Sequence, residues 1–522
     1  MVWTTGRRRG RGRWWWSMVV RGDEEMSMAE VGHGDVVVDK LTVPHRRESS
    51  GTGDATVDSL IRSEPLVGTP DMSVRQAAQL MTERNRDHVL IPLRDNGFGV
   101  ITDALIRERV VAEGVSADTA VTTLIDRRAP VVAPHVAASD ALTTILENDL
   151  TALPVVDPGG AVRGVVAPSD FVAAPGGPSV ALREQISRAR DIAELQERAS
   201  RVPYLVADLV RREQPAHSVT TMASLVTDAA VRRALELVLA SHPQLDPARL
   251  TWMSLGSNAR RETVLSSDID SAVSFSDDVT DEEVGAYRVA FGEVDDVLRG
   301  GGMVVDDNGA VASMPLFSRT HSRWRAAART WLAEPLENKG MILTSLMIDA
   351  RPIWGDEGLP AVGEVFGDLR GHRGTLNLLL AEALATKAKM RSVRDMLTRR
   401  GDEFDIKQHA IGPLVNFARW AALSVGSTQL DTRGRLRAAS GSELLPDDQA
   451  ETLVEVFEVL QRIRLNYQVA QFDRGEPVSD VMEMKRLSPL DRSMVAQAVR
   501  EIAGVQRRAA NRAHYLPVGS PD

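Results

Sequence analysis

The segment from Gly256 to Asp270 constrains this chain more than any other part of the sequence. It begins with a Gly-Ser pair and ends with two aspartates that flank one apolar residue, Asp268-Ile269-Asp270. If this end is extended, side chains alternate between faces, so both carboxylates point the same way while Ile269 points into the core. Neighbouring carboxylates suit Mg²⁺, which also takes the phosphates of a substrate as ligands. The segment therefore predicts a site for a divalent metal ion.

The residues around the Gly-Ser pair predict an anion pocket beside this site. The apolar run 250–255 is expected to be a buried strand. Gly256 allows the backbone to approach a phosphate closely, and the helix expected after it offers free N–H groups to an anion. Ser257 and these N–H groups are therefore expected to hold the phosphates of a triphosphate.

The turn at residues 256–262 has the sequence Gly-Ser-Asn-Ala-Arg-Arg-Glu, and Ser267 precedes the first aspartate. This arrangement resembles the polymerase β nucleotidyltransferase superfamily. It is most similar to bacterial PII uridylyltransferases and to their relatives that join CBS domains to a nucleotidyltransferase, where Gly usually stands in place of Ala259. The resemblance implies nucleotidyl transfer from UTP or ATP with two Mg²⁺ ions. Arg260 either contacts phosphate or pairs with Glu262 or Asp268 to hold the turn.

Two more site residues follow from the resemblance. The apolar run 341–349 has the length of a strand and ends at Asp349, where the family has an Asp-x-Arg sequence. The resemblance implies that Asp349 is the third metal ligand, beside Asp268 and Asp270, and gives it a second role as the catalytic base. Lys407 lies in the loop whose lysine faces the triphosphate in PII uridylyltransferases, so it is expected to bind the nucleotide.

A duplication spans about residues 64–174. Residues 88–106 match residues 150–172, because each copy has a β-rich run, a turn and a strand that leads into a helix, with Gly99 and Gly164 in equivalent places. An amphipathic helix is expected before each run. Two such β-α-β-β-α copies would bury their sheets against each other.

The duplication resembles tandem CBS domains, which commonly bind adenine nucleotides between the copies. In that family a Thr or Ser after the Gly-led strand holds phosphate, and an Asp three residues later holds ribose. The first copy has Thr102 but Leu105, and the second has Ala167 but Asp170. The resemblance implies AMP, ADP or ATP at Thr102 and Asp170 and a homodimer through these domains. A dimerisation platform without a ligand is the alternative.

These patterns predict an α+β multidomain protein with a tandem CBS (Bateman) module, a helical spacer, a polymerase β-type nucleotidyltransferase domain and a C-terminal helical bundle. Helical periodicity marks the spacer and the bundle. The expected parts are a disordered basic and polar N-terminus (1–60), the CBS module (61–176), the spacer (177–246), the nucleotidyltransferase domain (247–370), the helical substrate-binding domain (371–516) and a tail (517–522).

Composition narrows the classes of function. The chain of 522 residues contains no cysteine, which excludes disulfides and thiolate chemistry and suits a cytoplasmic protein. No apolar run is long enough to cross a bilayer. A net charge of −10 gives no general reason to expect nucleic acid as a partner. We therefore expect neither a membrane nor a nucleic-acid partner.

Two functions remain open on the sequence. The first is an active Mg²⁺-dependent transferase that places UMP or AMP on a hydroxyl group, with a small regulatory protein of PII type as the acceptor and with adenine nucleotides acting at the CBS pair. The second is a non-enzymatic nucleotide sensor with an inactive transferase fold. The three aspartates favour the first, whereas the incomplete CBS half-sites and Ala259 favour the second.

Overall fold

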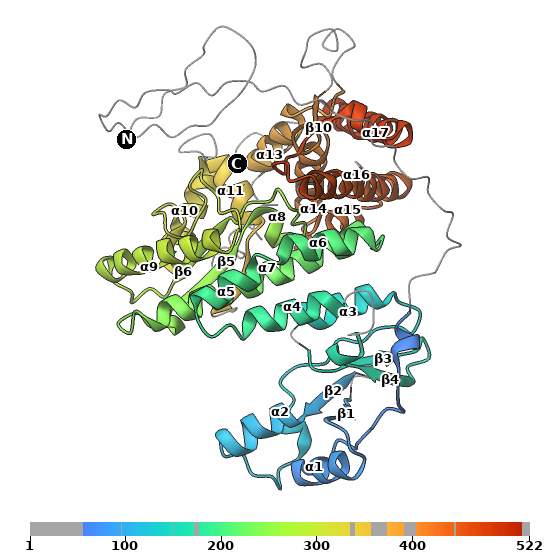
Figure 1. Ribbon diagram of the computed structural model, residues 1–522, viewed down its shortest axis with the longest axis vertical. Coiled ribbons are helices and arrows are strands. Elements are labelled where there is room, and N and C mark those ends of the chain that lie inside the picture. The colour runs from blue at the N-terminus through green and yellow to red at the C-terminus, as the bar shows by residue number, and fades with distance from the viewer. Residues whose placement is uncertain are drawn as a thin grey trace.

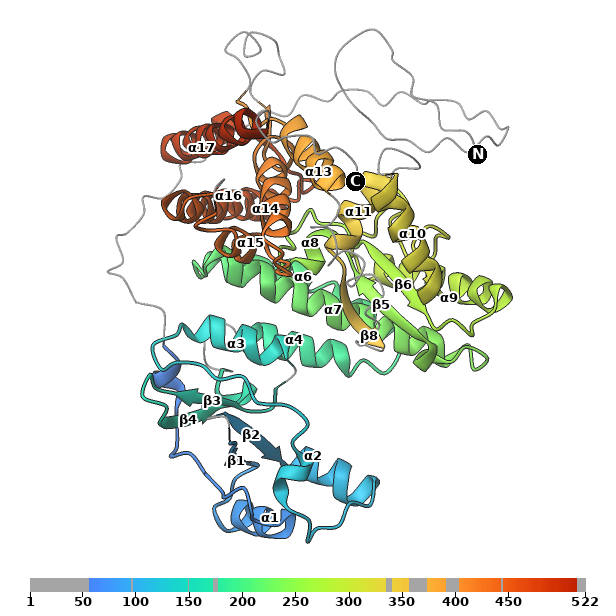
Figure 2. The same ribbon diagram turned by 180° about the vertical axis from the view of Figure 1, so that it is seen from behind.

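The computed structural model describes residues 56–94, 97–148, 150–171, 177–334, 340–355, 373–390, 403–442 and 445–513. Most of the segment predicted to be disordered, residues 1–60, lies outside this part of the chain. Figure 1 shows the duplicated module (blue to teal) at one end and the spacer helices (green) across the middle. The sheet domain and the C-terminal helices lie side by side at the other end (Figures 1 and 2).

The duplicated module has the predicted β-α-β-β-α order in its first copy. Each copy contains an antiparallel strand pair, β1–β2 or β3–β4, and a parallel bridge adds a third segment at Val67 or Val132. In the second copy the described residues directly after β4 form a 3₁₀ turn, η4. The elements are η1 (Val57–Leu60), α1 (Val74–Glu83), β1 (His88–Pro92), β2 (Phe98–Thr102), α2 (Asp103–Ile106), η2 (Arg107–Ala112), η3 (Val121–Leu124), α3 (Ala138–Glu147), β3 (Leu153–Val156), β4 (Val162–Val166) and η4 (Pro168–Phe171).

The two copies exchange their leading segments. A Cβ on Gly99 would lie 2.3 Å from Ile125, and a Cβ on Gly164 would lie 2.4 Å from Ile61. Ile61 precedes the first copy but packs on the second, while Ile125 precedes the second copy and packs on the first. The repeated glycines are therefore required for close packing, and neither copy completes its core alone.

The spacer is helical, as predicted. Its longest helix, α7, is buried along most of its length and begins directly after Pro215. Asp191 caps α5 by accepting a hydrogen bond from the N–H of Glu194 (2.8 Å). One continuous apolar core joins the second CBS copy, the spacer and one face of the sheet, whereas the first copy has a separate core. The spacer helices are α4 (Gly177–Ser187), α5 (Ile192–Ala199), α6 (Val202–Arg211) and α7 (Ala216–Ala240).

A four-stranded sheet of order β7-β6-β5-β8 forms the centre of the next domain. Every residue of β5 is buried, because helices cover both faces: Trp252 packs in the core with α7 and α9, and Met253 packs in the core with α10 and the C-terminal helices. The elements are η5 (Pro247–Arg249), β5 (Leu250–Ser254), α8 (Gly256–Ala259), β6 (Ser271–Phe275), α9 (Asp281–Gly300), β7 (Ser318–Thr320), α10 (His321–Ala333), α11 (Gly340–Ile348) and β8 (Arg351–Gly355).

The strand predicted for residues 341–349 is wrong. This run forms α11, and the strand follows it as β8, which pairs with β5. A short run that is apolar throughout shows neither a period of 2 nor one of 3.6, so the pattern could not separate a buried helix from a buried strand.

The C-terminal region is mainly helical, as predicted, with one short strand pair in addition. Strand β9 pairs with β10 far along the chain, with Phe404 opposite Met482. The elements are α13 (Arg373–Ala385), β9 (Glu403–Asp405), η8 (Lys407–Ile411), α14 (Gly412–Ser424), α15 (Thr432–Ala438), α16 (Asp447–Asp473), β10 (Val481–Glu483), η9 (Met484–Arg486) and α17 (Pro489–Ala513).

Candidate active site

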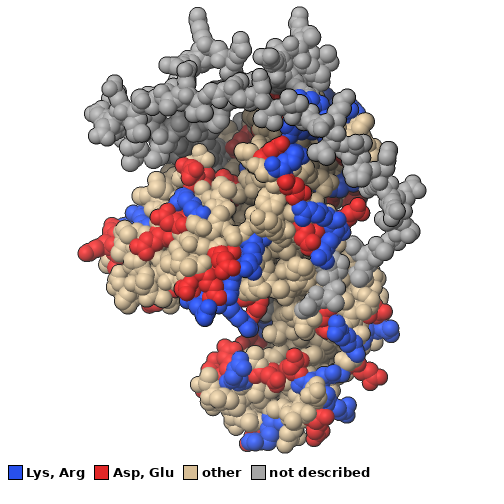
Figure 3. Space-filling view, viewed as in Figure 1, with Lys and Arg blue, Asp and Glu red and all other residues tan. Residues whose placement is uncertain are grey.

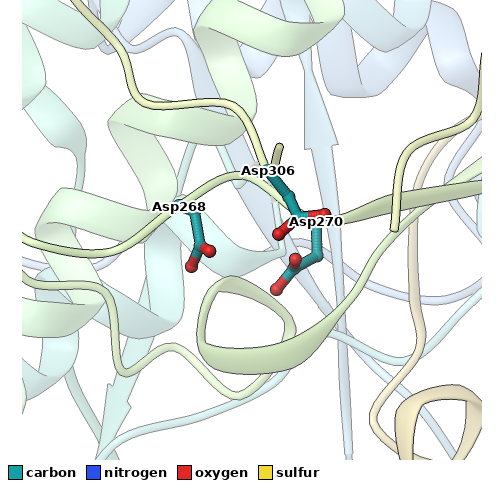
Figure 4. Close-up of side chains that lie close together, drawn as sticks. All are labelled: Asp268, Asp270 and Asp306. Atoms are coloured by element: carbon teal, nitrogen blue, oxygen red, sulfur yellow. The ribbon is translucent and has the colours of Figure 1, made fainter. Parts of the chain in front are cut away.

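Three carboxylates meet at the start of β6. Asp268, Asp270 and Asp306 each offer an oxygen, and these oxygens lie within 4.8 Å of one another (Figure 4). Ile269 between the first two is 6% exposed and belongs to the core. The alternation expected for Asp-Ile-Asp is therefore present, and the resulting group of oxygens suits a hard divalent ion. We call these three residues the carboxylate triad.

Asp306 reaches the triad through a backbone pairing that the sequence analysis missed. Val305 forms a parallel bridge with Ile269, and the N–H of Asp306 donates to the carbonyl of Ile269 (3.2 Å). The Asp306 carboxylate accepts hydrogen bonds from Asn308 Nδ2 (2.9 Å) and from the N–H of Ala310 (2.8 Å), which fix its orientation. The Val-Val-Asp run after a Gly-Gly-Gly turn was the available signal, because it is a short β-rich run that ends in a carboxylate.

The positively charged groups near the carboxylate triad do not balance its negative charge. Burial, together with Asp268 and Asp306, raises the pKa of Asp270 to about 8, although Lys407 and Arg260 act in the opposite direction. Three carboxylates crowded in a partly buried place repel one another unless a cation neutralises them. The residues present therefore fit a divalent metal ion held by oxygen ligands.

The Gly256 turn lies directly against the triad. Gly256 has a φ of +58°, and a Cβ there would lie 2.6 Å from Asp270 Oδ2. Both the backbone angle and the space therefore require glycine. Ser257 follows it and is partly exposed. Ala259, which replaces the family's glycine, is buried in α8, and the chain has a positive φ two residues later, at Arg261.

A buried network of hydrogen bonds and ion pairs holds the Gly256 turn in place. Asn258 Nδ2 donates to Asp228 Oδ1 (2.9 Å) on α7 and to Ser254 Oγ (2.7 Å) on β5. Arg351 donates to the carbonyl of Ala259 (3.1 Å) and forms an ion pair with Asp228 (3.0 Å). The spacer and β8 thus fix the turn that approaches the triad.

Arg260 pairs with acids, which favours the second of its two interpretations. Its Nε donates to Glu262 Oε2 (2.7 Å), and its Nη1 donates to Asp349 Oδ2 (2.6 Å). Glu262 in turn accepts a hydrogen bond from the N–H of Thr432 (2.7 Å). Arg260 therefore joins the turn to the C-terminal helical region.

The structure does not bring Asp349 together with Asp268 and Asp270. Asp349 is fully buried and also accepts hydrogen bonds from Arg419 (2.6 Å), with Arg435 2.7 Å from its other oxygen. Although burial alone would raise its pKa, these arginines and Arg260 hold the pKa of Asp349 well below its usual range. Its oxygens are engaged by guanidinium groups, and Asp306 takes the place beside Asp268 and Asp270 that the sequence analysis gave to Asp349.

Lys407 stands near the triad, as expected for a nucleotide-binding residue. It is exposed at the start of η8, and its charge acts on Asp270. Asp480 holds this loop in place, because its carbonyl accepts from the N–H of Ile406 (3.1 Å) and its carboxylate accepts from Ser266 Oγ (2.9 Å). The helical region is thereby fastened to the loop just before the Asp-Ile-Asp segment.

The two predicted CBS ligands take part in equivalent local turns. Thr102 Oγ1 accepts from the N–H of Leu105 (3.1 Å) and caps α2, while Asp170 Oδ2 accepts from the N–H of Ala167 (2.8 Å). Both side chains are partly exposed; Thr102 ends β2, and Asp170 lies in η4 after β4. Thr102 is equivalent to Ala167 and Asp170 to Leu105, so the two side chains occupy different positions of the same turn, and their role as nucleotide ligands stays a prediction.

On the face drawn in Figure 3, acidic and basic side chains are interspersed. Within the described ranges no helix combines the length and the hydropathy needed to span a bilayer.

The fold and the site define a multidomain protein with a nucleotidyltransferase-like sheet domain. Three family models match the chain: residues 200–338 match "Putative nucleotidyltransferase DUF294", residues 373–513 match "Putative nucleotidyltransferase substrate binding domain", and residues 121–177, the second copy of the duplication, match "CBS domain". These matches confirm the resemblance, because the chain carries a CBS domain together with both domains of a nucleotidyltransferase-type protein.

Solved structures are similar to the CBS module. A conserved CBS domain protein from Thermoplasma acidophilum is 21% identical over 25% of this chain and 74% of that chain, with a TM-score of 0.23. A CBS domain protein from Pyrobaculum aerophilum complexed with AMP is 17% identical over 22% and 90%, with a TM-score of 0.21. The CBS domain pair of protein MJ0100, in complex with 5′-methylthioadenosine and S-adenosyl-L-methionine, is 19% identical over 24% and 99%, with a TM-score of 0.22. No curated protein matches the chain.

Proposed function

We propose that this protein is a Mg²⁺-dependent nucleotidyltransferase that moves UMP or AMP from UTP or ATP to a hydroxyl group. One observation carries the proposal: Gly256 lies against Asp270, and Asp270 lies with Asp268 and Asp306 in a group compact enough to hold a metal ion. A phosphate-approaching turn and a metal site thus occupy one place, as transfer of a nucleotidyl group requires.

The residues of the site divide the work of this reaction. Bound Mg²⁺ would supply the charge that stabilises the attacking and leaving oxygens. Asp268, Asp270 and Asp306 would hold it, with Asp306 as the third ligand in place of Asp349. The N–H groups after Gly256, the Ser257 hydroxyl and Lys407 would bind the triphosphate. The acceptor oxygen would form a bond to the α-phosphorus as the bond to pyrophosphate breaks, and the proton of the hydroxyl group would pass to solvent.

Arg260 and Asp349 support the site without contacting substrate in this proposal. Together with Arg419 and Arg435 they form a buried cluster that connects the Gly256 turn with the C-terminal helical region. This cluster fixes the position of the domain that carries Lys407 relative to the domain that carries the triad.

One of the two sequence arguments for the non-enzymatic alternative, the presence of Ala259, is removed by the structure. Ala259 lies within helix α8, so this position does not need glycine. The incomplete CBS half-sites concern regulation and leave the triad untouched. The enzymatic proposal is therefore the better supported of the two.

The acceptor and the regulation follow from the family resemblance. We propose a small regulatory protein of PII type as the acceptor, adenine nucleotides near Thr102 and Asp170 as regulators, and a homodimer formed through the CBS module. Calorimetry of the whole protein with AMP, ADP and ATP, repeated with Asp170→Ala, tests the regulators. Unchanged heats in the variant would remove Asp170 from the ligand set.

The transfer reaction is tested with α-labelled UTP and ATP, Mg²⁺ and a lysate fraction that contains small acceptor proteins. The intact protein should attach label and release pyrophosphate, and Asp270→Asn should abolish both while its melting temperature is no lower than that of the unaltered protein. Transfer by Asp270→Asn at the original rate would refute the proposal.

A further inference from the structure

The start of helix α7 contacts two other domains at once. Helices α6 and α7 lie between α3 and α16 in both views of the molecule (Figures 1 and 2). His217, the second residue of α7, lies 3.2 Å from Asp140 on α3 through Nε2 and 3.4 Å from Glu458 on α16 through Nδ1. Helix α3 belongs to the segment that matches a CBS domain, and α16 belongs to the segment that matches the substrate-binding domain. One imidazole ring therefore joins these two domains.

Both ring nitrogens of His217 face carboxylate oxygens. Neutral imidazole has one N–H donor and one acceptor nitrogen, whereas imidazolium has two donors. An ionised carboxylate accepts hydrogen bonds and donates none. A neutral ring that donates to Asp140 would therefore turn its lone pair toward the oxygen of Glu458. The protonated ring is the form that suits both neighbours.

The Glu458 side of this contact has unused hydrogen-bonding atoms. His217 Nδ1 and Glu458 Oε1 are both buried, and neither forms a hydrogen bond of good geometry with a described residue. Arg433 Nε lies 3.0 Å from the same oxygen and is likewise without a hydrogen bond of good geometry. Native proteins rarely leave a buried donor or acceptor without a partner. A proton on Nδ1 supplies a donor where the oxygen needs one.

The charges around the ring also favour the proton. Burial and Arg433 lower the pKa of His217, but Asp140 and Glu458 outweigh them and raise the pKa above its usual value. The amide groups at the start of α7 oppose the proton as well. With His217 protonated, these four side chains carry two positive and two negative charges. Six other ionisable side chains line the same hollow between the domains: Glu147, Arg260, Arg261, Glu262, Arg351 and Asp431.

We propose that His217 is a proton-dependent link between the second CBS copy and the C-terminal helical region. The doubly protonated ring holds α3 and α16 against the start of α7. Loss of one proton leaves two carboxylates facing a neutral ring, so one of the two contacts is lost. A change of pH then changes how firmly the CBS module is attached. The link does not require the transfer reaction proposed above, because His217 is not part of the triad.

The direction of the pH dependence follows from the raised pKa of His217. Such a group stabilises the folded state fully below its pKa in the unfolded chain, about 6.5 for histidine, and this stabilisation is lost as the pH rises through the folded pKa. The hydrogen bond from His217 lowers the pKa of Asp140; burial raises the pKa of Glu458, but His217 and Arg433 lower it further. The contribution of these carboxylates is lost as the pH falls below about 4. The link is therefore strongest between about pH 5 and 6.5.

Nuclear magnetic resonance of the whole protein with ¹³C-labelled histidine measures the proton on His217. The chain contains ten histidines, so the His217 signal is the one that is absent from His217→Gln. Its pKa should lie above 6.5 and should be lower in both Asp140→Asn and Glu458→Gln. His242, near the other end of α7, pairs with Glu293 and is the control, because its titration should be the same in all three proteins. A His217 pKa below 6.5, or one that neither variant changes, would overturn the proposal.

Hydrogen exchange followed by mass spectrometry tests the link itself. The amides of α3 are compared between the unaltered protein and His217→Gln at the same pH, so that the intrinsic exchange rate cancels. At pH 6 they should exchange at least about threefold more slowly in the unaltered protein, and at pH 9 the two proteins should exchange alike. Helix α1 of the first copy, which packs in a separate core, is the control and should exchange alike at both pH values. A difference in α3 that is the same at pH 6 and pH 9, or absent at both, would overturn the proposal.

His217→Lys separates the charge from the shape of the side chain. Lysine keeps its proton up to about pH 10, so this variant should keep the slow exchange of α3 at pH 9, where the unaltered protein has lost it. The melting curve at pH 6 checks that each variant folds. Exchange that is slow at pH 6 and fast at pH 9 in His217→Lys would assign the pH dependence to another group and overturn the proposal.

Discussion

Asp349→Asn distinguishes a structural carboxylate from a catalytic one. Asp349 is buried among Arg260, Arg419 and Arg435, and the substitution leaves their positive charges without this partner. Removal of one member of a buried ion pair costs about 3–5 kcal/mol. We therefore expect the free energy of unfolding to fall by about this amount in urea titrations followed by circular dichroism, read on the transition that includes the C-terminal helices.

Asp295→Asn is the matched control for this experiment. Asp295 is also buried, but it accepts a hydrogen bond from Ser313, and no ion pair with a described arginine is found there. Burial raises its pKa to about 6, although the charge of Arg299 acts in the opposite direction. Its neutral replacement should leave stability at neutral pH unchanged or slightly raised. Our reasoning fails if Asp349→Asn unfolds like the unaltered protein and yet no longer binds Mg²⁺, because Asp349 would then be a metal ligand.

Three other predictions concern the active site. Mg²⁺ competes with the proton on Asp270, whose pKa is raised to about 8, so calorimetry should show the Mg²⁺ affinity rising up to about tenfold per pH unit from pH 6 to 8 and staying constant above pH 8. The metal-free protein should lose stability as the pH rises from about 4 to 8, because Asp270 loses its proton in the folded state. Asp270→Asn should remove both trends. Gly256→Ala should weaken Mg²⁺ binding at least tenfold, because the added Cβ displaces Asp270 Oδ2. Gly475→Ala is the control: Gly475 has a φ of +66° and open space around it, so the substitution carries a similar backbone cost of about 1–2 kcal/mol but should leave Mg²⁺ binding unchanged. Lys407→Gln should raise the KM for the nucleotide about five- to tenfold with little change in kcat, and an unchanged KM would remove it from the nucleotide site.

Local patterns predicted the parts of the fold that depend on neighbours in sequence. The Asp-Ile-Asp alternation, the Gly256 turn and the helices before each CBS copy have their causes within a few residues. The duplication predicted the paired strands because each copy repeats the same order of elements. The exchange of leading segments between the copies needed three-dimensional packing, since Ile61 and Ile125 contact glycines of the other copy.

The choice of the third carboxylate shows what sequence patterns alone could not predict. Asp349 and Asp306 are both aspartates next to apolar runs, and the family resemblance favoured Asp349. What separates them is long-range: α11 and the arginines at 419 and 435 enclose Asp349, whereas the bridge from Val305 to Ile269 brings Asp306 to the triad. Neither contact is encoded in local periodicity, so a single sequence could not decide between the two.

Mg²⁺ binding to Asp306→Asn and Asp307→Asn, measured side by side by calorimetry, tests the central claim most directly. The two aspartates are adjacent, but the Asp306 carboxylate belongs to the triad while the Asp307 side chain is 91% exposed. We predict that Asp306→Asn weakens Mg²⁺ binding at least about tenfold and that Asp307→Asn binds like the unaltered protein. Equal Mg²⁺ affinity in Asp306→Asn and the unaltered protein would contradict the assignment of the metal site.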